Sequence, residues 1–266
     1  MRIAGKVVVL TGGSEGIGAA CAAAFRSKGA HLVLTARNRE KLEAVGGADA
    51  LIVPGDIKDP ATRVRIVDEA LARHGRIDVL INNAGVGMYS PSWRAPMDSV
   101  RDMFELNVFS LLELTQLVVP RMREQRGGMI VNLSSIAGKV PLPWFTAYSA
   151  SKYALCALSD GLRMELKDDN IRVMTVCPGY VRTGFQRNVL AGEPPERVWR
   201  ARRFAITAEH CAQAILRGIE NESRTIVTPR IGWVLIAMQR LFPQLVEWQL
   251  RRYYNGLDRK GLNLPE

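Results

Sequence analysis

Short runs of β-branched residues alternate with longer segments of helical composition along most of this chain, and that alternation limits its fold more than any other feature. The seven strand-like runs are "KVVVLT" from Lys6, "HLVLTA" from His31, "ALIVPG" from Ala50, "IDVLINN" from Ile77, "GMIVNLSS" from Gly128, "IRVMTVCPG" from Ile171 and "RTIVTP" from Arg224. Several are apolar throughout, as strands buried on both faces are. Strands separated by helices form right-handed βαβ units. The sequence therefore predicts an α/β fold with a doubly wound, mostly parallel seven-stranded sheet and helices on both faces.

Length and turn residues predict how the chain is organised. A chain of 266 residues fits one large α/β domain, and no internal repeat is visible, so residues 1–266 are expected to form a single domain. Residues 184–206 are rich in glycine and proline, and we expect them to form a lid next to the site. Residues 229–266 continue past the last predicted strand as a C-terminal extension.

Charge and cysteine content bear on partners and compartment. The net charge of +10 suits an anionic ligand, a nucleic acid or an acidic membrane surface, and does not choose among them. The four cysteines form no C-x-x-C pair and have apolar neighbours, so we expect buried, reduced thiols. The N-terminus has no signal-peptide pattern, and no uninterrupted apolar run reaches the roughly 18 residues that a membrane-spanning helix requires. These observations predict a cytoplasmic protein.

A glycine-rich turn follows the first predicted strand. The stretch "TGGSEGIG" runs from Thr11 to Gly18 and leads directly into the helical segment "AACAAAFRSKG". A strand, a glycine-rich turn and a helix N-terminus present backbone N–H groups to a pyrophosphate, and small residues permit its close approach. The residues expected to contact the cofactor here are Gly12, Ser14, Glu15, Gly16, Ile17 and Gly18. The glycine order is G-x-x-x-G-x-G, and a turn that only permits tight packing is the alternative.

The end of the second predicted strand bears on which dinucleotide would bind. Sites of this kind normally place an acid here, where it binds the adenosine ribose hydroxyls. This chain has no acid at that point, because Thr35 and Ala36 are followed by Arg37, with Arg39 close behind. A guanidinium group favours a 2′-phosphate over a free hydroxyl, so the sequence predicts NADP(H) rather than NAD(H). Alternatively, both arginines are solvated charges at the start of a helix.

Tyr148 and Lys152 lie four residues apart in "TAYSASKYAL", a stretch of helical composition. At that spacing both side chains lie on one helix face, and a phenol held near an ammonium group is a proton donor with a lowered pKa. An isolated pair of this kind is more often a partly buried Tyr and a solvated Lys. The other motifs of the chain reverse that interpretation.

Several separate motifs occur in order along residues 4–228. They are "TGGSEGIG", "GDI" with Asp56, "NNAG" at Asn82 to Gly85, "ELNVFS" with Asn107, "NLSS" with Ser135, "YSASK" with Tyr148 and Lys152, and "PGYVRT" at Pro178 to Thr183. In this order they resemble the short-chain dehydrogenase/reductase family. The resemblance implies a Rossmann-like fold and hydride transfer between a nicotinamide cofactor and a carbonyl or secondary alcohol.

The resemblance also implies which residues contact the cofactor. Asp56 and Ile57 would line the adenine pocket, and Thr11 would brace the surrounding architecture. The turn that supports the cofactor near its adenosine ribose would contain Asn83, Ala84 and Gly85. The residues implied around the nicotinamide and its carboxamide are Pro178, Gly179, Val181 and Thr183.

Four residues are implied in catalysis. Tyr148 would donate a proton to the carbonyl oxygen, and Lys152 together with the positive charge of the oxidised nicotinamide would stabilise the phenolate. Ser135 would hold that oxygen by a hydrogen bond; Ser134 is one residue out of the family's usual spacing, and adjacent strand residues point to opposite sides. Lys152 would also bind the nicotinamide ribose, and Asn107 would hold a water that returns the proton through Lys152.

Two helices and the C-terminal extension suggest further contacts. By the resemblance, helices around Val108–Val119 and Tyr153–Leu166 would pair across a two-fold axis in a homodimer or homotetramer, with core packing as the alternative. Pro120 is expected to end the first of these helices. Residues 229–266 mix aromatic and aliphatic side chains with arginines, which suits either a helix lying in a membrane surface or a helical pair capping the active site or the dimer. The arginine-rich stretch Arg197–Phe204 would lie in the lid.

The function predicted is an NADP(H)-dependent oxidoreductase acting on a CH–OH group. The apolar extension and basic lid favour a lipophilic substrate, steroid-like or long-chain. The alternatives are a reductase of acyl-thioesters carried by an acidic protein, and a non-enzymatic NADP(H)-binding sensor or scaffold. The histidines join no carboxylate or cysteine pattern, so no metal site is expected. Net charge is the only feature of the sequence that favours nucleic-acid binding. Pocket walls are expected from the lid and from Val86, Val140, Trp144, Phe145 and Phe185.

Overall fold

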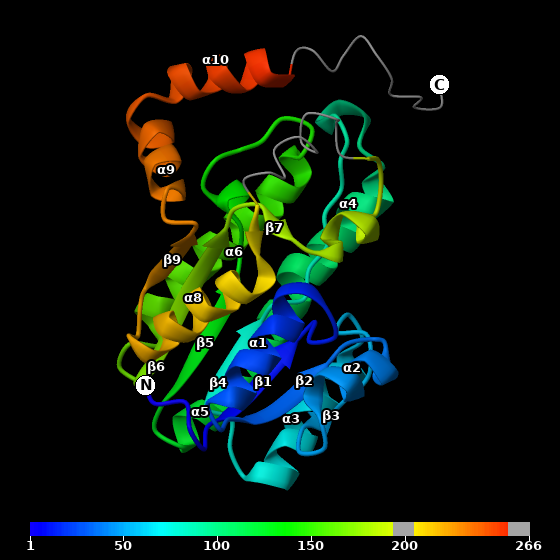
Figure 1. Ribbon diagram of the computed structural model, residues 1–266, viewed down its shortest axis with the longest axis vertical. Coiled ribbons are helices and arrows are strands. Elements are labelled where there is room, and N and C mark those ends of the chain that lie inside the picture. Colours follow the sequence, from blue (N-terminus) through cyan, green and yellow to red (C-terminus); the bar gives the residue numbers. More distant parts are fainter. Residues whose placement is uncertain (194–204, 255–266) are drawn as a thin grey trace.

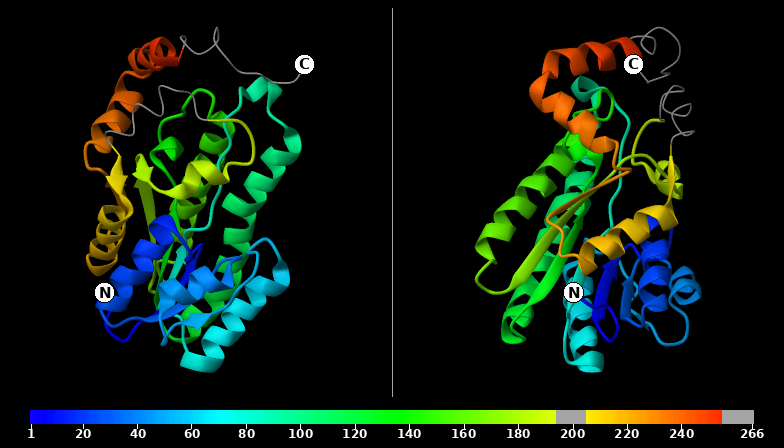
Figure 2. Two further views of the ribbon diagram at one scale, coloured as in Figure 1. Left: turned by 45° about the vertical axis from the view of Figure 1, so that its right-hand side comes forward. Right: turned by 60° about the vertical axis from the view of Figure 1, so that its left-hand side comes forward.

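A parallel sheet lies between two layers of helices in the computed structural model (Figures 1 and 2). The structure describes residues 1–193 and 205–254, and of Tyr253 and Tyr254 it describes the backbone only. The strands are β1 (Val7–Thr11), β2 (His31–Thr35), β3 (Leu51–Ile52), β4 (Val79–Asn82), β5 (Gly128–Leu133), β6 (Ile171–Pro178) and β9 (Thr225–Thr228). They are all parallel, in the order β3-β2-β1-β4-β5-β6-β9. The predicted fold class is therefore confirmed, with a strand at each of the seven expected positions.

The two layers of helices bury opposite sides of the same strands. On β1, Val8 and Leu10 pack in one core with α1 (Gly16–Ser27), α2 (Arg39–Gly46) and α8 (Ala208–Glu220). Val7 and Val9 pack in a second core with α3 (Pro60–His74) and α5 (Ser110–Glu124). The helix α6 (Thr146–Glu165) also packs against this second core. Successive strand residues point to opposite faces, so a fully apolar strand serves both cores. This explains why the strand-like runs lack polar alternation.

One expected helix end is wrong. Pro120 lies inside α5, which continues to Glu124. Proline removes one backbone hydrogen bond, and both Pro120 and Gln116, whose carbonyl loses that partner, are exposed, so water can replace the missing donor.

A long helical stretch also bears on the membrane. It comprises α4 (Met97–Phe104), a π-helical turn (Glu105–Phe109) and α5, and it is long and apolar enough to cross a membrane by length and composition. No such stretch was predicted from the sequence, because charged residues interrupt its apolar runs. In the structure α5 packs its apolar face on the sheet, as a core helix does.

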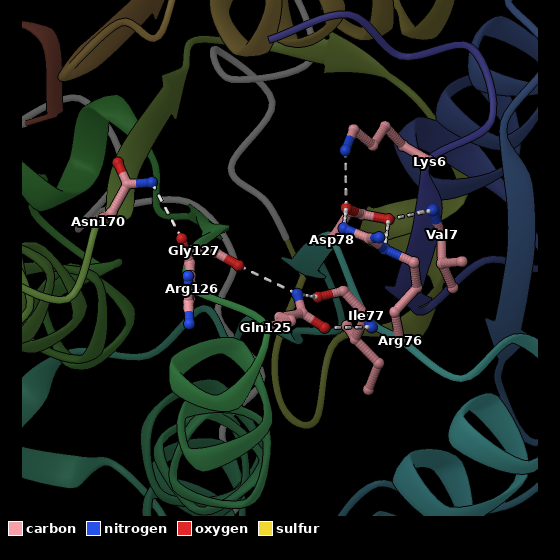
Figure 3. A network of polar contacts seen from close by, with 9 residues as sticks. All are labelled: Lys6, Val7, Arg76, Ile77, Asp78, Gln125, Arg126, Gly127 and Asn170. Atoms are coloured by element: carbon pink, nitrogen blue, oxygen red, sulfur yellow. Dashed lines mark hydrogen bonds and ion pairs between the residues drawn. The ribbon is translucent and has the colours of Figure 1, made fainter.

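A buried carboxylate joins the amino-terminal ends of β1 and β4 (Figure 3). Asp78, which precedes β4, accepts hydrogen bonds from the Val7 backbone N–H at 3.0 Å, from Lys6 Nζ at 3.0 Å and from Arg76 Nη2 at 2.7 Å. Burial alone would raise the pKa of Asp78, but the bonds from Arg76, Val7 and Lys6 hold it below its usual value. The network therefore stabilises the β1–β4 pair at the end opposite the site.

The chain after β6 contains two short strands that the sequence did not predict, and a C-terminal helical pair that was one of the two alternatives. Val181–Arg182 (β7) and Ile206–Thr207 (β8) pair as a small parallel sheet. Within residues 184–206, Gly184–Asn188 forms a 3-10 helix, whereas the basic stretch Arg197–Phe204 lies outside the described residues. After β9, α9 (Gly232–Leu241) and α10 (Pro243–Tyr254) form a helical pair, and the rest of the C-terminal extension is not described.

Candidate active site

A cavity of about 940 Å³ lies at the carboxyl ends of β1, β2, β4, β5 and β6. Ligands of doubly wound sheets bind at this edge, because the connections there diverge on either side of the sheet. It is lined by Ser135, Tyr148 and Lys152 of the predicted catalytic set. Of the predicted cofactor contacts, it is lined by Gly12, Ser14, Glu15, Gly16, Ile17, Arg37, Asp56, Ile57, Asn83, Ala84, Gly85, Pro178, Gly179, Val181 and Thr183. Gly18 and Asn107 are buried and do not line the cavity.

The glycine-rich turn is braced from β4. The Thr11 hydroxyl accepts hydrogen bonds from the backbone N–H groups of Asn83 and Ala84, both at 3.0 Å. The Asn83 side-chain amide donates back to the carbonyl of Thr11 at 2.9 Å. At Gly18 a Cβ atom would lie only 2.1 Å from the Gly12 carbonyl oxygen, so no larger residue fits without a backbone shift. These contacts fix the turn at the N-terminus of α1.

The other end of the cavity is rich in charge. Arg37 is exposed at the cavity wall and makes no hydrogen bond or ion pair with the described residues. Lys58 lies near enough for the Arg37 charge to act on it, and its Nζ is 2.6 Å from Asp102 Oδ1. Lys41, also on the wall, lies 3.8 Å from Glu15 Oε2. Sequence reasoning missed both lysines, since nothing in the local pattern distinguishes them from ordinary surface lysines.

A nicotinamide dinucleotide fits the chemistry of this wall. Among the described residues, the hydroxyl of Thr35 on the wall is buried without a hydrogen-bond partner. Because this hydroxyl has almost no accessible surface, it lies beneath the cavity wall and is not itself placed to contact a ligand. The close-packed turn at the N-terminus of α1 and the exposed Arg37 guanidinium, which has no partner among the described residues, suit a ligand that carries phosphate groups.

Tyr148 and Lys152 lie on the buried face of α6, where their spacing brings them together. Tyr148 is 6% exposed and Lys152 is 3% exposed. The Lys152 ammonium lies 5.7 Å from the centroid of the Tyr148 ring and donates a hydrogen bond to the Leu133 carbonyl at 2.9 Å. The lysine is thus held between the phenol and the end of β5.

The two neighbouring serines after β5 point to different groups. Ser135 lies close enough to Tyr148 to lower the pKa of the phenol, and its Oγ donates to the Pro178 carbonyl at 3.5 Å and accepts from the Ala137 N–H at 3.1 Å. Ser134 instead donates to the Lys152 carbonyl at 2.9 Å and lies 3.2 Å from Cys156 Sγ. Only Ser135 therefore has its hydroxyl beside the phenol, whereas Ser134 fixes the backbone of α6.

Burial shifts the pKa values of the phenol and the ammonium group. Burial raises the pKa of Tyr148 above its usual value, and the neighbouring Ser135 hydroxyl opposes that shift only in part. For the protein alone this differs from the lowered phenol pKa expected from the sequence, because desolvation raises the pKa by more than Ser135 lowers it. Burial also lowers the pKa of Lys152 to about 8, so this group exchanges its proton near neutrality.

Asn107 lies in the π-helical turn between α4 and α5 and is fully buried. Its Oδ1 accepts from the Val86 N–H at 2.9 Å, and its Nδ2 donates to the Val86 carbonyl at 2.8 Å and to Ser151 Oγ at 3.1 Å. A Cβ on Gly85 would lie 3.1 Å from Asn107 Oδ1 and 3.3 Å from Lys152 Nζ. Asn107 and Lys152 therefore flank the same glycine. Ser151 was missed because Ser is an ordinary residue inside a helix.

Aromatic side chains surround the phenol. The Phe145 ring lies 4.2 Å from the Tyr148 ring and 4.5 Å from the Tyr89 ring, between centroids, and Phe185 meets Tyr148 edge-on at 5.7 Å. Phe145, Phe185 and Val86 line the cavity as expected, but the sequence did not single out Tyr89 or Leu235 of α9.

Two expected wall residues lie elsewhere. Val140 is buried in the core beneath α9, and Trp144 pairs with Trp93 at 6.2 Å. Their positions depend on how the chain folds after β5, which local pattern does not determine.

The described residues contain no cluster of side chains that could hold a metal ion. In the described ranges, 1–193 and 205–254, no three His, Cys, Asp or Glu residues are placed to hold an ion. His31 and His74, distant in sequence, stack at 5.3 Å on the far side of the fold from Tyr148. All four cysteines are buried free thiols.

Comparison with known proteins places the fold and the motifs in one family. The family model for the short chain dehydrogenase matches residues 6–194. A dehydrogenase/reductase SDR family protein 7-like from Anopheles gambiae is 31% identical, over 96% of this chain and 84% of its own length. The ketoacyl reductase HetN of Nostoc is 30% identical, over 96% and 91%, and an 11-beta-hydroxysteroid dehydrogenase-like protein of Arabidopsis thaliana is 32% identical, over 94% and 81%.

Solved structures agree with the sequence relatives. A short chain dehydrogenase from Burkholderia cenocepacia in complex with NADP is 29% identical with a TM-score of 0.79, covering 94% of this chain and 99% of that one. A short chain dehydrogenase/reductase from Burkholderia phymatum in complex with NAD is 26% identical with a TM-score of 0.83, covering 94% and 96%. The two structures hold different dinucleotides, so similarity of fold does not choose between them.

Proposed function

The chain belongs to the short-chain dehydrogenase/reductase family of oxidoreductases, and we propose that it transfers hydride between NADP(H) and a carbonyl or secondary alcohol of a lipophilic compound. The observation that carries this proposal is the placement of Ser135 and Lys152 beside the Tyr148 phenol, on a cavity wall whose neighbouring side chains are aromatic. The cofactor, when bound, supplies or accepts the hydride.

Cofactor binding is proposed to use the two ends of the cavity differently. The backbone of the Gly12 to Gly18 turn, at the N-terminus of α1, would hold the pyrophosphate. Arg37 would bind a 2′-phosphate, with the charges of Lys41 and Lys58 adding to the attraction. Asp56 and Ile57 would contact the adenine, and residues 83–85 the ribose. Lys152 and residues 178–183 would hold the nicotinamide half.

Proton transfer is proposed to run from Tyr148 Oη to the substrate oxygen. Ser135 would donate a hydrogen bond to the same oxygen and so stabilise the negative charge that develops there. Because burial raises the pKa of the phenol, the phenolate left behind needs a nearby positive charge, which protonated Lys152 supplies. A lysine with a pKa of about 8 can then return the proton near neutral pH. Asn107, beside Gly85, would hold a water on that path.

The walls around Tyr148 support a lipophilic substrate. Tyr89, Phe145 and Phe185 offer ring faces and edges, and Leu142 and Leu235 add aliphatic surface. A flat or long apolar ketone would bury more area there than a small polar one. Reduction of a ketoacyl thioester is the second candidate, favoured by the resemblance to HetN. Turnover of a cyclic or long-chain ketone, with none of a ketoacyl thioester, separates the two.

NADP(H) preference is tested by titrating the protein with NADPH and NADH and following nicotinamide fluorescence. Arg37→Ala should weaken NADPH binding about ten- to a hundredfold and leave NADH unchanged, since one charged hydrogen-bond donor contributes about 1.5 to 3 kcal/mol. Arg39→Ala is the matched control, because Arg39 pairs with Glu43 at 3.2 Å and does not line the cavity. Equal binding of both cofactors by the wild type would refute the assignment.

A homodimer or homotetramer in the cytoplasm completes the proposal. The helices expected to pair expose Phe109, Leu117, Tyr153 and Met164, and Met164 is 75% exposed. Apolar surface of this kind on two neighbouring helices suits association with a second copy. Sedimentation velocity of the wild type and of Met164→Asp tests it: the variant should shift toward the monomer.

Buried free thiols suit a reducing compartment, and α9 and α10 suit a membrane surface.

A further inference from the structure

The C-terminal helical pair exposes an unusual amount of apolar surface. Of the fifteen large hydrophobic side chains that are exposed within residues 1–193 and 205–252, seven lie between Ile231 and Trp248. Leu241 is 71% exposed, Phe242 is 60% exposed and Trp248 is 53% exposed. Single exposed apolar residues are ordinary, but a concentration of this kind marks a surface that something else covers.

A second segment adds to the same end of the molecule. Trp93, in the 3-10 turn Ser92–Arg94, is 76% exposed, and Met97 at the start of α4 is 55% exposed. In Figures 1 and 2, α10 and the chain that leads into α4 lie at the same end of the molecule, away from the N-terminus. We call the exposed apolar side chains of these two segments the docking face: Trp93, Met97, Ile231, Trp233, Val234, Leu241, Phe242, Leu245 and Trp248.

The orientation of the helical pair is fixed by its inner side. Ile236 of α9 and Val246 of α10 are buried in the core that also contains Val140 and Val227. Leu235, on the inner side of α9, lines the catalytic cavity. Trp233 and Leu241 lie eight residues apart on the outer side and are exposed. One face of α9 thus borders the cavity while the opposite face is presented outward.

Charge decides between a lipid surface and a second copy of the chain. Residues 229–252 contain Arg230, Arg240, Arg251 and Arg252, with Glu247 as the single acid. The Arg252 guanidinium lies over the Trp248 ring at 5.4 Å. Two such surfaces facing one another would oppose their arginines, whereas an anionic bilayer would pair with them while its interface accepts the aromatic rings.

We propose that the docking face binds the surface of an anionic bilayer, seating the rim of the catalytic cavity on the lipid. A lipophilic substrate would then pass between the bilayer and the cavity alongside Leu235 without crossing bulk water. The second statement rests on the proposed function, whereas the binding itself does not. The protein would lie on the bilayer through α9, α10 and the turn at Trp93.

The experiment is co-sedimentation of the full chain with vesicles of phosphatidylcholine alone or with about one third phosphatidylserine, with tryptophan fluorescence recorded in parallel. The wild type should bind the anionic vesicles with a blue shift. Replacing three docking residues together, Leu241→Ser, Phe242→Ser and Trp248→Ser, should weaken binding at least about tenfold. Arg240→Glu with Arg251→Glu should weaken it by about fivefold or more per charge, and added salt should mimic that loss.

Matched controls are Val64→Ser on α3 and Arg217→Glu on α8, an exposed apolar side chain and an exposed arginine away from the docking face. Both should bind vesicles as the wild type does. Wild-type protein that stays in the supernatant, or a triple variant that sediments like the wild type, overturns the proposal. So does a triple variant whose mass in solution drops to that of a smaller oligomer, since the face would then cover a second copy.

Failure of the docking proposal is distinguishable from failure of the proposed function. None of the three substituted residues lines the cavity, so the triple variant should keep wild-type NADPH affinity and wild-type turnover of a small, water-soluble ketone without vesicles. Loss of NADPH binding by the wild type would remove the proposed function and leave vesicle binding to be judged by itself.

Discussion

Replacing Lys152 by Met should change how the stability of the cofactor-free protein depends on pH. The Lys152 ammonium is 3% exposed, and its burial lowers its pKa from 10.5 to about 8. Between these values the unfolded chain binds a proton that the folded protein does not, so wild-type stability rises with pH across this window. At 1.36 kcal/mol per pKa unit, the penalty carried below pH 8 is about 3 kcal/mol. Met, of similar length, carries no such penalty.

Urea unfolding of both proteins between pH 7 and 10.5 measures the effect. The free energy of unfolding of Lys152→Met minus that of the wild type should fall by about 3 kcal/mol as pH rises from 8 to 10.5. Loss of the Nζ bond to the Leu133 carbonyl offsets this difference by a constant amount. Lys58→Met is the control, because the bond with Asp102 raises the pKa of Lys58 above 10.5, outside the window. A difference that does not vary with pH would refute the reasoning.

Three further substitutions test separate parts of the structure. Ser135→Ala should lower kcat by about a hundredfold, because it removes a donor at the substrate oxygen, and Ser134→Ala should lower it less; comparable losses would contradict the assignment. Gly18→Ala should lower the free energy of unfolding by roughly 1–3 kcal/mol, since its Cβ meets a carbonyl oxygen; unchanged urea unfolding would contradict this. Asp78→Asn should destabilise the protein above the carboxyl's unfolded pKa and progressively less as pH falls through its lowered folded pKa.

The sheet was predictable because its signal is local. Each strand is a short apolar run bounded by turn residues, and the chirality of βαβ units then leaves few arrangements. Pro120 was misjudged because its effect depends on exposure, which sequence does not give. The two-residue strands β7 and β8 carry no periodicity and pair across 23 intervening residues, so nothing local predicts them.

The candidate site was predictable to the extent that its residues belong to motifs. Tyr148, Lys152 and Ser135 lie together because helix spacing and strand alternation fix where they point. Tyr89, Ser151 and Leu235 were missed, since their roles arise from contacts between distant segments. The phenol pKa differed because burial cannot be read from a four-residue spacing. Val140 was predicted to line the pocket but is buried in the core beneath α9, because the sequence does not show which apolar side chains face the cavity.

The most direct test of the account is the rate of NADPH oxidation with a lipophilic cyclic ketone by the wild type and by Tyr148→Phe. Phenylalanine keeps the ring contacts with Phe145 and removes only the proton donor. The account predicts wild-type turnover, a loss of roughly a hundred- to ten-thousandfold in the variant, and unchanged NADPH affinity. A Tyr148→Phe variant that oxidises NADPH at the wild-type rate would contradict the central claim, because Tyr148 would then not be the proton donor.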